Sequence, residues 1–376
     1  MTLGFRPAPA LTACALAVAA VVTPLASSSP APRPPQAKTT LSAATRVQVE
    51  AAAKRGAAYL RAQQLPNGTW QNHPGVTGLV AAAMFRVPGA SRATELATTG
   101  KALDWLRTLA KPDGGIHADD LETYVTAIAV MALQAGGRTQ DLPVIEKARA
   151  FLITQLLDEG EGLSPSDAFY GGIGYRPATT KDAARGDIIN LEYGLRALKE
   201  TDLAPDDAAW TKAVQFLQRL QNAKASNDQP WAAEDGGFVY QPGLSKADDK
   251  TTSYGSATYA GVLGFLYANV KKGDPRMDAA MKWIREHYTV DENPGMGQKT
   301  VYYYYMVLAK ALASVGEDVV VDAKGQSHNW REELAAKLLS LQRPEGFWVN
   351  PVRDEWQDNP VLVTAFTLTA LQYILQ

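Results

Sequence analysis

The chain has 376 residues, of which 46% are hydrophobic, and a formal net charge of −2 from 37 basic and 39 acidic residues. Its length allows one large domain with an extensive core, or two to three ordinary domains. The nearly balanced, scattered charge argues against nucleic acid as a partner and gives no electrostatic support for binding an anionic membrane surface.

The first 28 residues differ from the rest and are predicted to be a secretory signal peptide. A short basic start with Arg6 is followed by the apolar stretch APALTACALAVAAVVTPLA and a Ser- and Pro-rich segment, which is the three-part layout of an export signal. A retained membrane anchor is the alternative, but Pro24 interrupts the short apolar stretch. Residues 29–45 are predicted to be a linker. We therefore expect an exported protein, periplasmic or secreted, of a bacterial envelope, and membrane association stays open.

Cys14 is the only cysteine of the chain and lies inside the predicted signal. Leu11 to Cys14 resembles a lipoprotein box, although the apolar stretch mostly follows the cysteine, so lipid attachment is the less favoured alternative. Removal of the signal would leave no cysteine, which excludes disulfides, thiolate nucleophiles and cysteine-ligated zinc. The four histidines lack a zinc-ligand spacing, and no Gly-rich phosphate loop is present. No metal and no cofactor are expected.

A seven-residue phrase occurs twice, as QLPNGTW at 64–70 and as QRPEGFW at 342–348. Four weaker copies lie between them, and the apolar residue that closes each copy recurs every 46 to 65 residues. The closing residues are Trp70, Ile116, Ile173, Phe238, Met296 and Trp348. A period of this size predicts a repeat architecture instead of two domains.

Each repeat is predicted to be a helical hairpin. The segment before the closing residue has apolar positions at helical spacing, such as Phe216, Leu217 and Leu220, and ends at a Gly suited to a left-handed turn. Six further segments are apolar nearly all round, as helices buried on both sides must be. They are residues 76–84, 124–133, 189–198, 256–265, 303–312 and 362–371.

Residues 46–376 are therefore predicted to form one all-α domain, an α/α toroid of six hairpins with an inner and an outer ring. An open solenoid is the alternative. Similar phrases in the first and last repeats favour closure, because open solenoids usually have atypical polar caps. The phrase itself is interpreted as a structural staple, since a Gln amide can pair with free backbone groups at a helix end and a Trp can pack over the turn. The staple residues are Gln64, Gly68, Trp70, Gln342, Gly346 and Trp348.

The beginnings of the inner helices are the first candidates for a site. Aligning the six segments places His73, Glu122, Asp187, Tyr254, Val301 and Pro360 at equivalent positions. A carboxylic acid in an apolar cavity has a raised pKa and can donate a proton. Asp187 and then Glu122 are therefore the candidate catalytic residues, with helix capping as the alternative role.

Aromatic residues on the same helices predict the lining of a central cavity. Ring faces stabilise a developing positive charge. Tyr302 to Tyr305 form a run of four, of which only one or two can face a cavity, and core packing is the alternative. The expected lining residues are His73, Tyr124, Asn190, Tyr193, Tyr254, Tyr259 and Tyr305.

Two long loops resemble each other, GGIGYRPATTKD at 171–182 and GGFVYQPGLSKADD at 236–249. They lie on adjacent repeats, at the end of the toroid where the inner helices begin, and are predicted to form a rim or lid. Arg176, Lys181 and Lys246 are available there for an anionic head group such as a diphosphate. Ordinary surface loops are the alternative.

The stretch RGAAYLRAQQLPNGTW at 55–70 resembles the QW repeat of the squalene-hopene and oxidosqualene cyclases. The chain is also similar to bacterial proteins described as prenyltransferase- or squalene-cyclase-like, and the same toroid occurs in the β subunits of protein prenyltransferases. The resemblance implies an apolar central cavity for an isoprenoid or another lipid. The family's Asp-x-Asp-Asp acid motif is absent, since HADD at 117–120 and KADD at 246–249 lack the first Asp, and Asp-Asp-x-x-Asp is also absent.

Three functions stay open at this stage. The first is a prenyltransferase- or terpene cyclase-like enzyme that initiates cyclisation or isomerisation with an acid and without a metal. The second is a non-catalytic envelope protein that binds a lipid, a glycan or a protein. The third is a carbohydrate-active enzyme of the double-ring type, in which Glu122 and Asp187 would flank a sugar.

Overall fold

The computed structural model describes residues 41–376, apart from residues 119 and 249. The predicted signal peptide at 1–28, with Cys14, and residues 29–40 of the predicted linker lie outside the described residues. The first helix, α1 (Ala43–Ala62), begins within the last part of that linker segment. None of the helices in the described part of the chain has the length and apolar character needed to cross a membrane.

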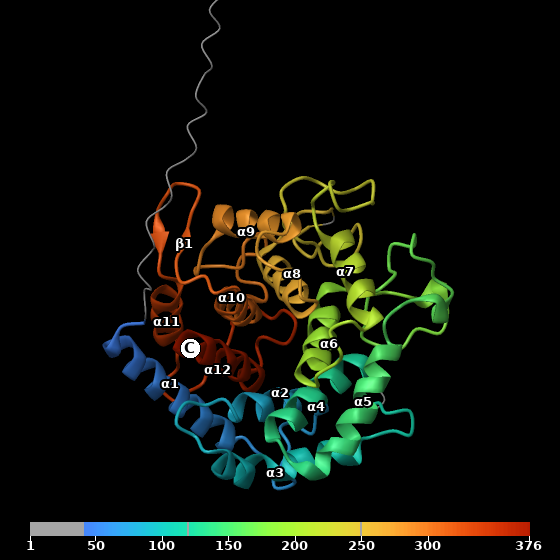
Figure 1. Cartoon of the computed structure of the whole chain (residues 1–376). Helices are drawn as coiled ribbons and strands as arrows, with labels where there is room; N and C mark the ends of the chain where they lie inside the picture. The colour runs from blue at the N-terminus through green and yellow to red at the C-terminus, as the bar shows by residue number, and fades with distance from the viewer. Residues whose placement is uncertain (1–40, 119, 249) are drawn as a thin grey trace, which may run out of the picture. The chain divides into compact units, whose positions relative to one another are not determined.

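The described residues form the predicted all-α toroid, with six outer helices alternating along the chain with six inner helices (Figure 1). The outer helices are α1, α3 (Arg92–Thr108), α5 (Leu142–Thr154), α7 (Ala208–Leu220), α9 (Pro275–His287) and α11 (Trp330–Leu341). The inner helices are α2 (Pro74–Met84), α4 (Glu122–Gly136), α6 (Ile188–Glu200), α8 (Gly255–Tyr267), α10 (Val301–Val315) and α12 (Pro360–Leu375). Short elements complete the chain: η1 (Thr139–Asp141), η2 (Glu159–Glu161), η3 (Lys181–Ala183) and an antiparallel pair of β1 (Val320–Val321) and β2 (Ser327–His328).

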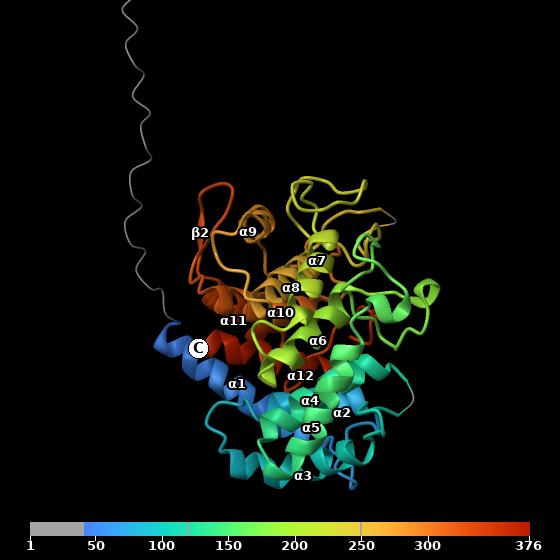
Figure 2. The ribbon, with the colours of Figure 1, turned by 45° about the vertical axis from the view of Figure 1, so that its right-hand side comes forward.

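The inner helices form a closed ring. Each packs against the next in chain order, from α2 through α12, and α12 packs against α2 (Figures 1 and 2). Because every inner helix has neighbours on both sides and an outer helix behind it, it is buried nearly all round, and in α8 all residues from 255 to 265 are buried. This burial explains why the inner segments are apolar on every face.

The repeated phrase joins each outer helix to the next one. Gln64 Nε2 donates to the carbonyl of Thr98 in α3 at 2.9 Å, and Gln342 Nε2 donates to the carbonyl of Ala52 in α1 at 2.9 Å. Each amide also donates to the glycine carbonyl of its own phrase at 2.8 Å. The second phrase therefore connects the last repeat to the first.

The tryptophan of the phrase closes the turn from an outer to an inner helix. Trp70 is fully buried, its Nε1 donates to the carbonyl of Leu60 at 2.7 Å, and its backbone N–H donates to Thr77 Oγ1 at 3.1 Å. Trp348 makes the equivalent two contacts at 2.7 and 3.2 Å. The phrase is thus fully occupied by structural contacts in both copies.

The two ends of the toroid meet beside α1. Arg46 Nη1 donates to the carbonyl of Leu375 at 2.9 Å, and Thr45 Oγ1 donates to Glu332 Oε2 at 2.7 Å. Helix α1 packs against α11 and α12, the last two helices of the chain. These contacts, together with the Gln342 amide, close the outer ring.

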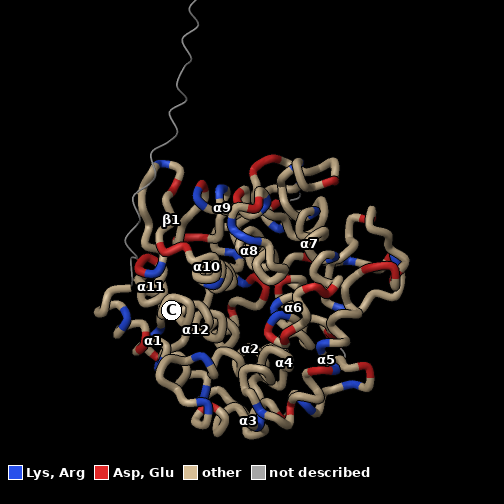
Figure 3. Tube along the Cα trace, in the orientation of Figure 1, with Lys and Arg blue, Asp and Glu red and all other residues tan. Residues whose placement is uncertain are grey.

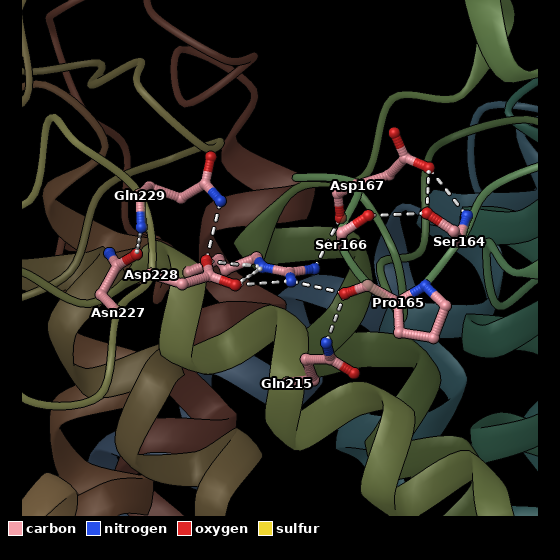
Figure 4. A network of polar contacts seen from close by, with 9 residues as sticks. Ser164, Pro165, Ser166, Asp167, Gln215, Asn227, Asp228 and Gln229 are labelled. Carbon is pink, nitrogen blue, oxygen red and sulfur yellow. Dashed lines mark hydrogen bonds and ion pairs between the residues drawn. The ribbon is translucent and has the colours of Figure 1, made fainter.

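Charged residues of both signs are intermingled along the loops and outer helices (Figure 3). One charged residue, Arg219 of α7, is buried and organises the long loops that follow α5 and α7. Its guanidinium donates to both carboxylate oxygens of Asp228, at 2.9 and 2.7 Å, and to the carbonyls of Pro165 and Asp167, at 2.6 and 2.5 Å (Figure 4). Gln215 also donates to Pro165. This network holds both loops, which carry the two predicted rim segments, against α7.

Candidate functional site

The beginnings of the inner helices are capped by loops of the following repeat. The backbone N–H of Thr123 in α4 donates to the carbonyl of Tyr175 at 3.1 Å, and that of Ile188 in α6 donates to the carbonyl of Tyr240 at 3.0 Å. Free N–H groups at a helix start need such acceptors. The two tyrosines occupy the same place in the two parallel loops, so both predicted rim segments are fixed over this end of the ring.

An outer chamber of about 410 Å³ lies at this end. Its size is in the usual range for a small-molecule site. Two inner helices contribute His73 and Tyr124, and the long loops contribute Tyr175, Arg176, Tyr240 and Lys246. The predicted rim therefore borders a real cavity.

An inner chamber of about 90 Å³ adjoins the outer one and shares Tyr124, Tyr175, Lys246, Glu355 and Leu362 with it. The inner chamber is more deeply enclosed. The rest of its wall is aromatic, apolar or uncharged, and includes Ile189, Tyr193, Tyr254, Met296, Tyr303 and Phe366.

Four of the residues predicted to line the cavity do line these chambers. They are His73 and Tyr124 in the outer chamber, and Tyr193 and Tyr254 in the inner one, which Tyr124 also borders. Of the predicted head-group residues, Arg176 and Lys246 are on the wall.

Three other predicted lining residues lie elsewhere. Asn190 is turned to Asp187, which its Nδ2 contacts at 2.6 Å. Tyr259 packs edge-on against Tyr304 in the core. The hydroxyl of Tyr305 donates to a loop carbonyl at residue 290, so Tyr305 does not line either chamber, and Tyr303 is the member of the tyrosine run that does.

Lys181 is also outside both chambers. Its Nζ lies 2.6 Å from a carboxylate oxygen of Asp167, and the side chain is 56% exposed. Lys181 begins the 3-10 helix η3 and lies in the same loop after α5 as Asp167. Of the two lysines in the parallel loops, only Lys246 is therefore placed to meet a ligand.

Asp187 is the N-cap of α6 and is 1% exposed. Its Oδ1 accepts from the backbone N–H groups of Ile189 and Asn190 at 2.9 and 3.0 Å, and its Oδ2 accepts from the Asn190 amide. Burial nevertheless raises the pKa of Asp187 to about 6, because loss of solvation outweighs these three donors. The residue combines the capping role with the raised pKa, and it lies behind the chamber wall.

Glu122 is the first residue of α4 and sits at the rim. Its Oε2 lies 3.7 Å from Nε of Arg176, which also binds Asp120. The Glu122 side chain is 21% exposed, and Arg176 lies between this carboxylate cluster and the outer chamber as one of the chamber's lining residues.

Two residues that line the outer chamber, Glu355 and Trp356, precede α12 and were not predicted from the sequence. Both have left-handed backbone conformations, with φ of +47° and +61°. Glu355 Oε1 accepts from Lys246 Nζ at 2.6 Å, and Trp356 contacts His73 edge-on at 5.1 Å. No motif marks these positions, whereas Tyr175 and Tyr240, also missed, stand out as the shared Tyr of the two parallel loops.

A buried ion pair lies behind the inner chamber. Lys310 Nζ of α10 contacts Glu192 Oε1 of α6 at 2.8 Å, and the hydroxyl of Tyr267 donates to the same oxygen at 3.1 Å. Burial, and then the nearby Arg196, lower the pKa of Lys310 to about 7. In the described part of the chain, no group of three His, Cys, Asp or Glu side chains is arranged to hold a metal ion.

The closed double ring resembles the fold of solved type II terpene cyclases. MstE, a type II terpene cyclase from Scytonema, is 16% identical, with a TM-score of 0.54 over 87% of this chain and 98% of that chain. A variant of MstE with 15% identity and a TM-score of 0.54 over 88% and 99% of the two chains contains geranylgeranyl dihydroxybenzoate as substrate. A wild-type glycosidase is 14% identical, with a TM-score of 0.52 over 89% and 99%.

No protein-family model matches the sequence. A search of curated protein sequences finds no significant match either. The likeness to solved structures therefore establishes the fold, while the relation to prenyltransferases and to the QW repeat stays a prediction.

Proposed function

We propose that the protein is a terpene cyclase-like enzyme that holds an isoprenoid or a similar small hydrophobic molecule in the two chambers. The observation that carries this proposal is the wall of the inner chamber, where tyrosines meet apolar side chains from several inner helices. Aromatic faces exclude water and stabilise positive charge that develops on a hydrocarbon. Binding would remain favourable through burial of the apolar chain.

Asp187 is the proton donor in this proposal. With its pKa of about 6, about a tenth of the Asp187 carboxyl groups are protonated at pH 7, and this protonated form is the one that acid-initiated isomerisation or cyclisation requires. It lies behind the chamber wall, so the proton would have to cross that wall to reach the ligand. Glu122 is less suited because it lies at the rim, 3.7 Å from Arg176 Nε, and lines neither chamber.

The experiment is incubation of the protein with linear isoprenoid alcohols of increasing length in deuterated water, followed by mass spectrometry of the products. We expect an isomer that has gained deuterium at carbon. Asp187→Asn should abolish formation of this isomer without loss of ligand binding. Glu122→Gln should leave the amount of the isomer unchanged. Failure of every isoprenoid to bind would overturn the proposal, and full turnover by Asp187→Asn would remove Asp187 from it.

A second candidate function is glycoside hydrolysis, favoured by the pair of Glu355 and Trp356. The Trp356 side chain is 56% exposed at the mouth of the cavity, where an indole face could stack on a sugar. Release of reducing sugar from oligosaccharides, lost on Glu355→Gln, would support this function over the first. If the assay detects no activity on any glycan, glycoside hydrolysis is overturned and the isoprenoid proposal remains.

A further inference from the structure

Three tyrosines of the inner chamber have hydroxyl groups that lack a hydrogen-bond partner among the residues that the structure describes. Tyr193, Tyr254 and Tyr303 belong to α6, to the N-cap of α8 and to α10, and they are 1%, 1% and 7% exposed. A buried hydroxyl normally finds a partner, because an unpaired polar group away from water is costly. Three such groups around one chamber indicate that a bound molecule supplies the partner.

Three other polar side chains of this wall are already paired. Ser256 Oγ and Thr300 Oγ1 both accept from the Asn293 amide, at 3.1 and 3.0 Å. Gln357 Oε1 accepts from the backbone N–H of Tyr302 at 3.0 Å. Tyr193, Tyr254 and Tyr303 therefore differ from these three side chains in having buried hydroxyls without a partner.

The charged groups on and behind the wall each have at least one partner, although Glu192 Oε2 has none among the described residues. Lys246 pairs with Glu355 at 2.6 Å, and Glu192, behind Tyr303, pairs with Lys310 at 2.8 Å. Asp187 accepts three hydrogen bonds. Since these charges already have partners, an ionic group of a ligand would enter the chamber without a free counter-charge, and its desolvation would be poorly compensated.

The three phenols act as neutral hydrogen-bonding groups. Burial raises the pKa of Tyr254 and of Tyr303 well above the usual value, so both hydroxyls keep their protons and can donate them to an acceptor. Such donors suit an oxygen atom and offer nothing to a bare hydrocarbon end.

We propose that the inner chamber recognises a neutral oxygen-bearing group of the ligand, a hydroxyl or a carbonyl, through the hydroxyls of Tyr193, Tyr254 and Tyr303. The inference rests on the proposed function, because it takes a hydrophobic molecule to occupy the cavity. The 90 Å³ of the inner chamber suit one such group, while the hydrocarbon fills the 410 Å³ of the outer chamber.

The test compares three probes with one carbon skeleton: geraniol, its carboxylate geranate, and the parent hydrocarbon without oxygen. Binding to the protein is measured by equilibrium dialysis and gas chromatography. We expect geraniol to bind more tightly than the other two. Tyr303→Phe should weaken geraniol binding roughly tenfold, the worth of one good hydrogen bond, and leave the hydrocarbon unchanged. Tyr305→Phe, on the same helix with its hydroxyl bonded outside the chamber, should change neither.

The outcomes separate this inference from the proposed function. Equal affinity for geraniol and the hydrocarbon, or no effect of Tyr303→Phe, would overturn the inference and leave the hydrophobic site standing. Tighter binding of geranate than of geraniol would show that the chamber prefers an anion, and would also overturn the inference. Absence of binding by all three probes would overturn both proposals. If Tyr303→Phe does not fold, as judged by its melting curve, Tyr254→Phe takes its place in the same comparison.

Discussion

Asp187 shows how two opposing effects meet in one side chain. Its carboxylate caps α6 and accepts three hydrogen bonds. These donors alone would lower the pKa of the Asp187 carboxyl group. The group is fully enclosed, however, and the loss of solvation dominates, so the pKa is raised to about 6. The residue therefore stabilises the helix by its geometry and destabilises the fold by its charge.

This conflict predicts an unusual pH dependence. Between about pH 4, the unfolded pKa of an Asp, and pH 6, the folded state binds more protons than the unfolded state, so this group makes stability fall as pH rises. Asp187→Asn keeps the capping oxygen, and the unpaired Asn190 Oδ1 can accept from the new amide. We expect the variant to be about 1–3 kcal/mol more stable than the parent at pH 7, and similar at pH 4.

Urea unfolding at the two pH values measures this difference. The parent is expected to lose stability relative to the variant on going from pH 4 to pH 7. An equal effect of Asp187→Asn at both values would show that the carboxyl group is not protonated more readily in the folded state, and would also weaken its assignment as a proton donor.

At the level of single residues, the sequence could locate the ends of the inner helices but not the direction of their side chains. His73, Asp187 and Tyr254 are N-caps, and Glu122 is a first helical residue, because the apolar pattern marks where each buried helix begins. The apolar pattern does not determine how each helix is rotated about its own axis. Tyr303 and Tyr305 are two residues, or about 200°, apart, so only one can face the chamber, and the packing of neighbours decides which.

At the level of the elements, the period of the repeat was enough to predict all six hairpins and the closure. The Gly of the phrase has a specific role in that closure. Gly346 has φ of +96°, and a Cβ there would lie 2.7 Å from the carbonyl oxygen of Arg55 in α1. Residues 349–359, between the second phrase and α12, carry no repeated signal, and the sequence therefore did not show that Glu355 and Trp356 would reach the cavity.

Gly346→Ala is expected to destabilise the protein more than Gly273→Ala. Gly273 has a closely similar φ of +91° but open space where a Cβ would stand. Both variants carry the strain of a left-handed alanine, about 1–2 kcal/mol, and only Gly346→Ala also pushes against the backbone of α1. Thermal unfolding should show the larger loss for Gly346→Ala, with hydrogen exchange in α1 accelerated. Equal losses would mean that α1 shifts freely and that closure is loose.

At the level of the whole molecule, the ion pair of Lys310 and Glu192 connects α10 and α6, which are not neighbours in the inner ring. The two side chains are 4% and 1% exposed. A buried ion pair contributes little more to the free energy of folding than an apolar pair of similar volume would. Removing one partner, however, leaves a buried charge without compensation.

Lys310→Met should therefore destabilise the protein by about 3–5 kcal/mol, because it leaves Glu192 buried and unpaired. The double variant Lys310→Met with Glu192→Gln should recover most of this loss. Urea unfolding of the two variants and the parent checks the expectation. A double variant as unstable as the single one would show that the shape of the lysine side chain matters more than its charge.

The closure of the ring also has a consequence for the order of synthesis. The main packing partners of α1 are α11 and α12, so α1 leaves the ribosome well before the two helices that cover its apolar face. Until then Val49, Ala53 and Leu60, all buried in the finished protein, are open to other chains, and transient exposure of this kind favours aggregation. Every chain that stops short of α11 leaves the same face uncovered, which marks incomplete products for chaperones and proteases.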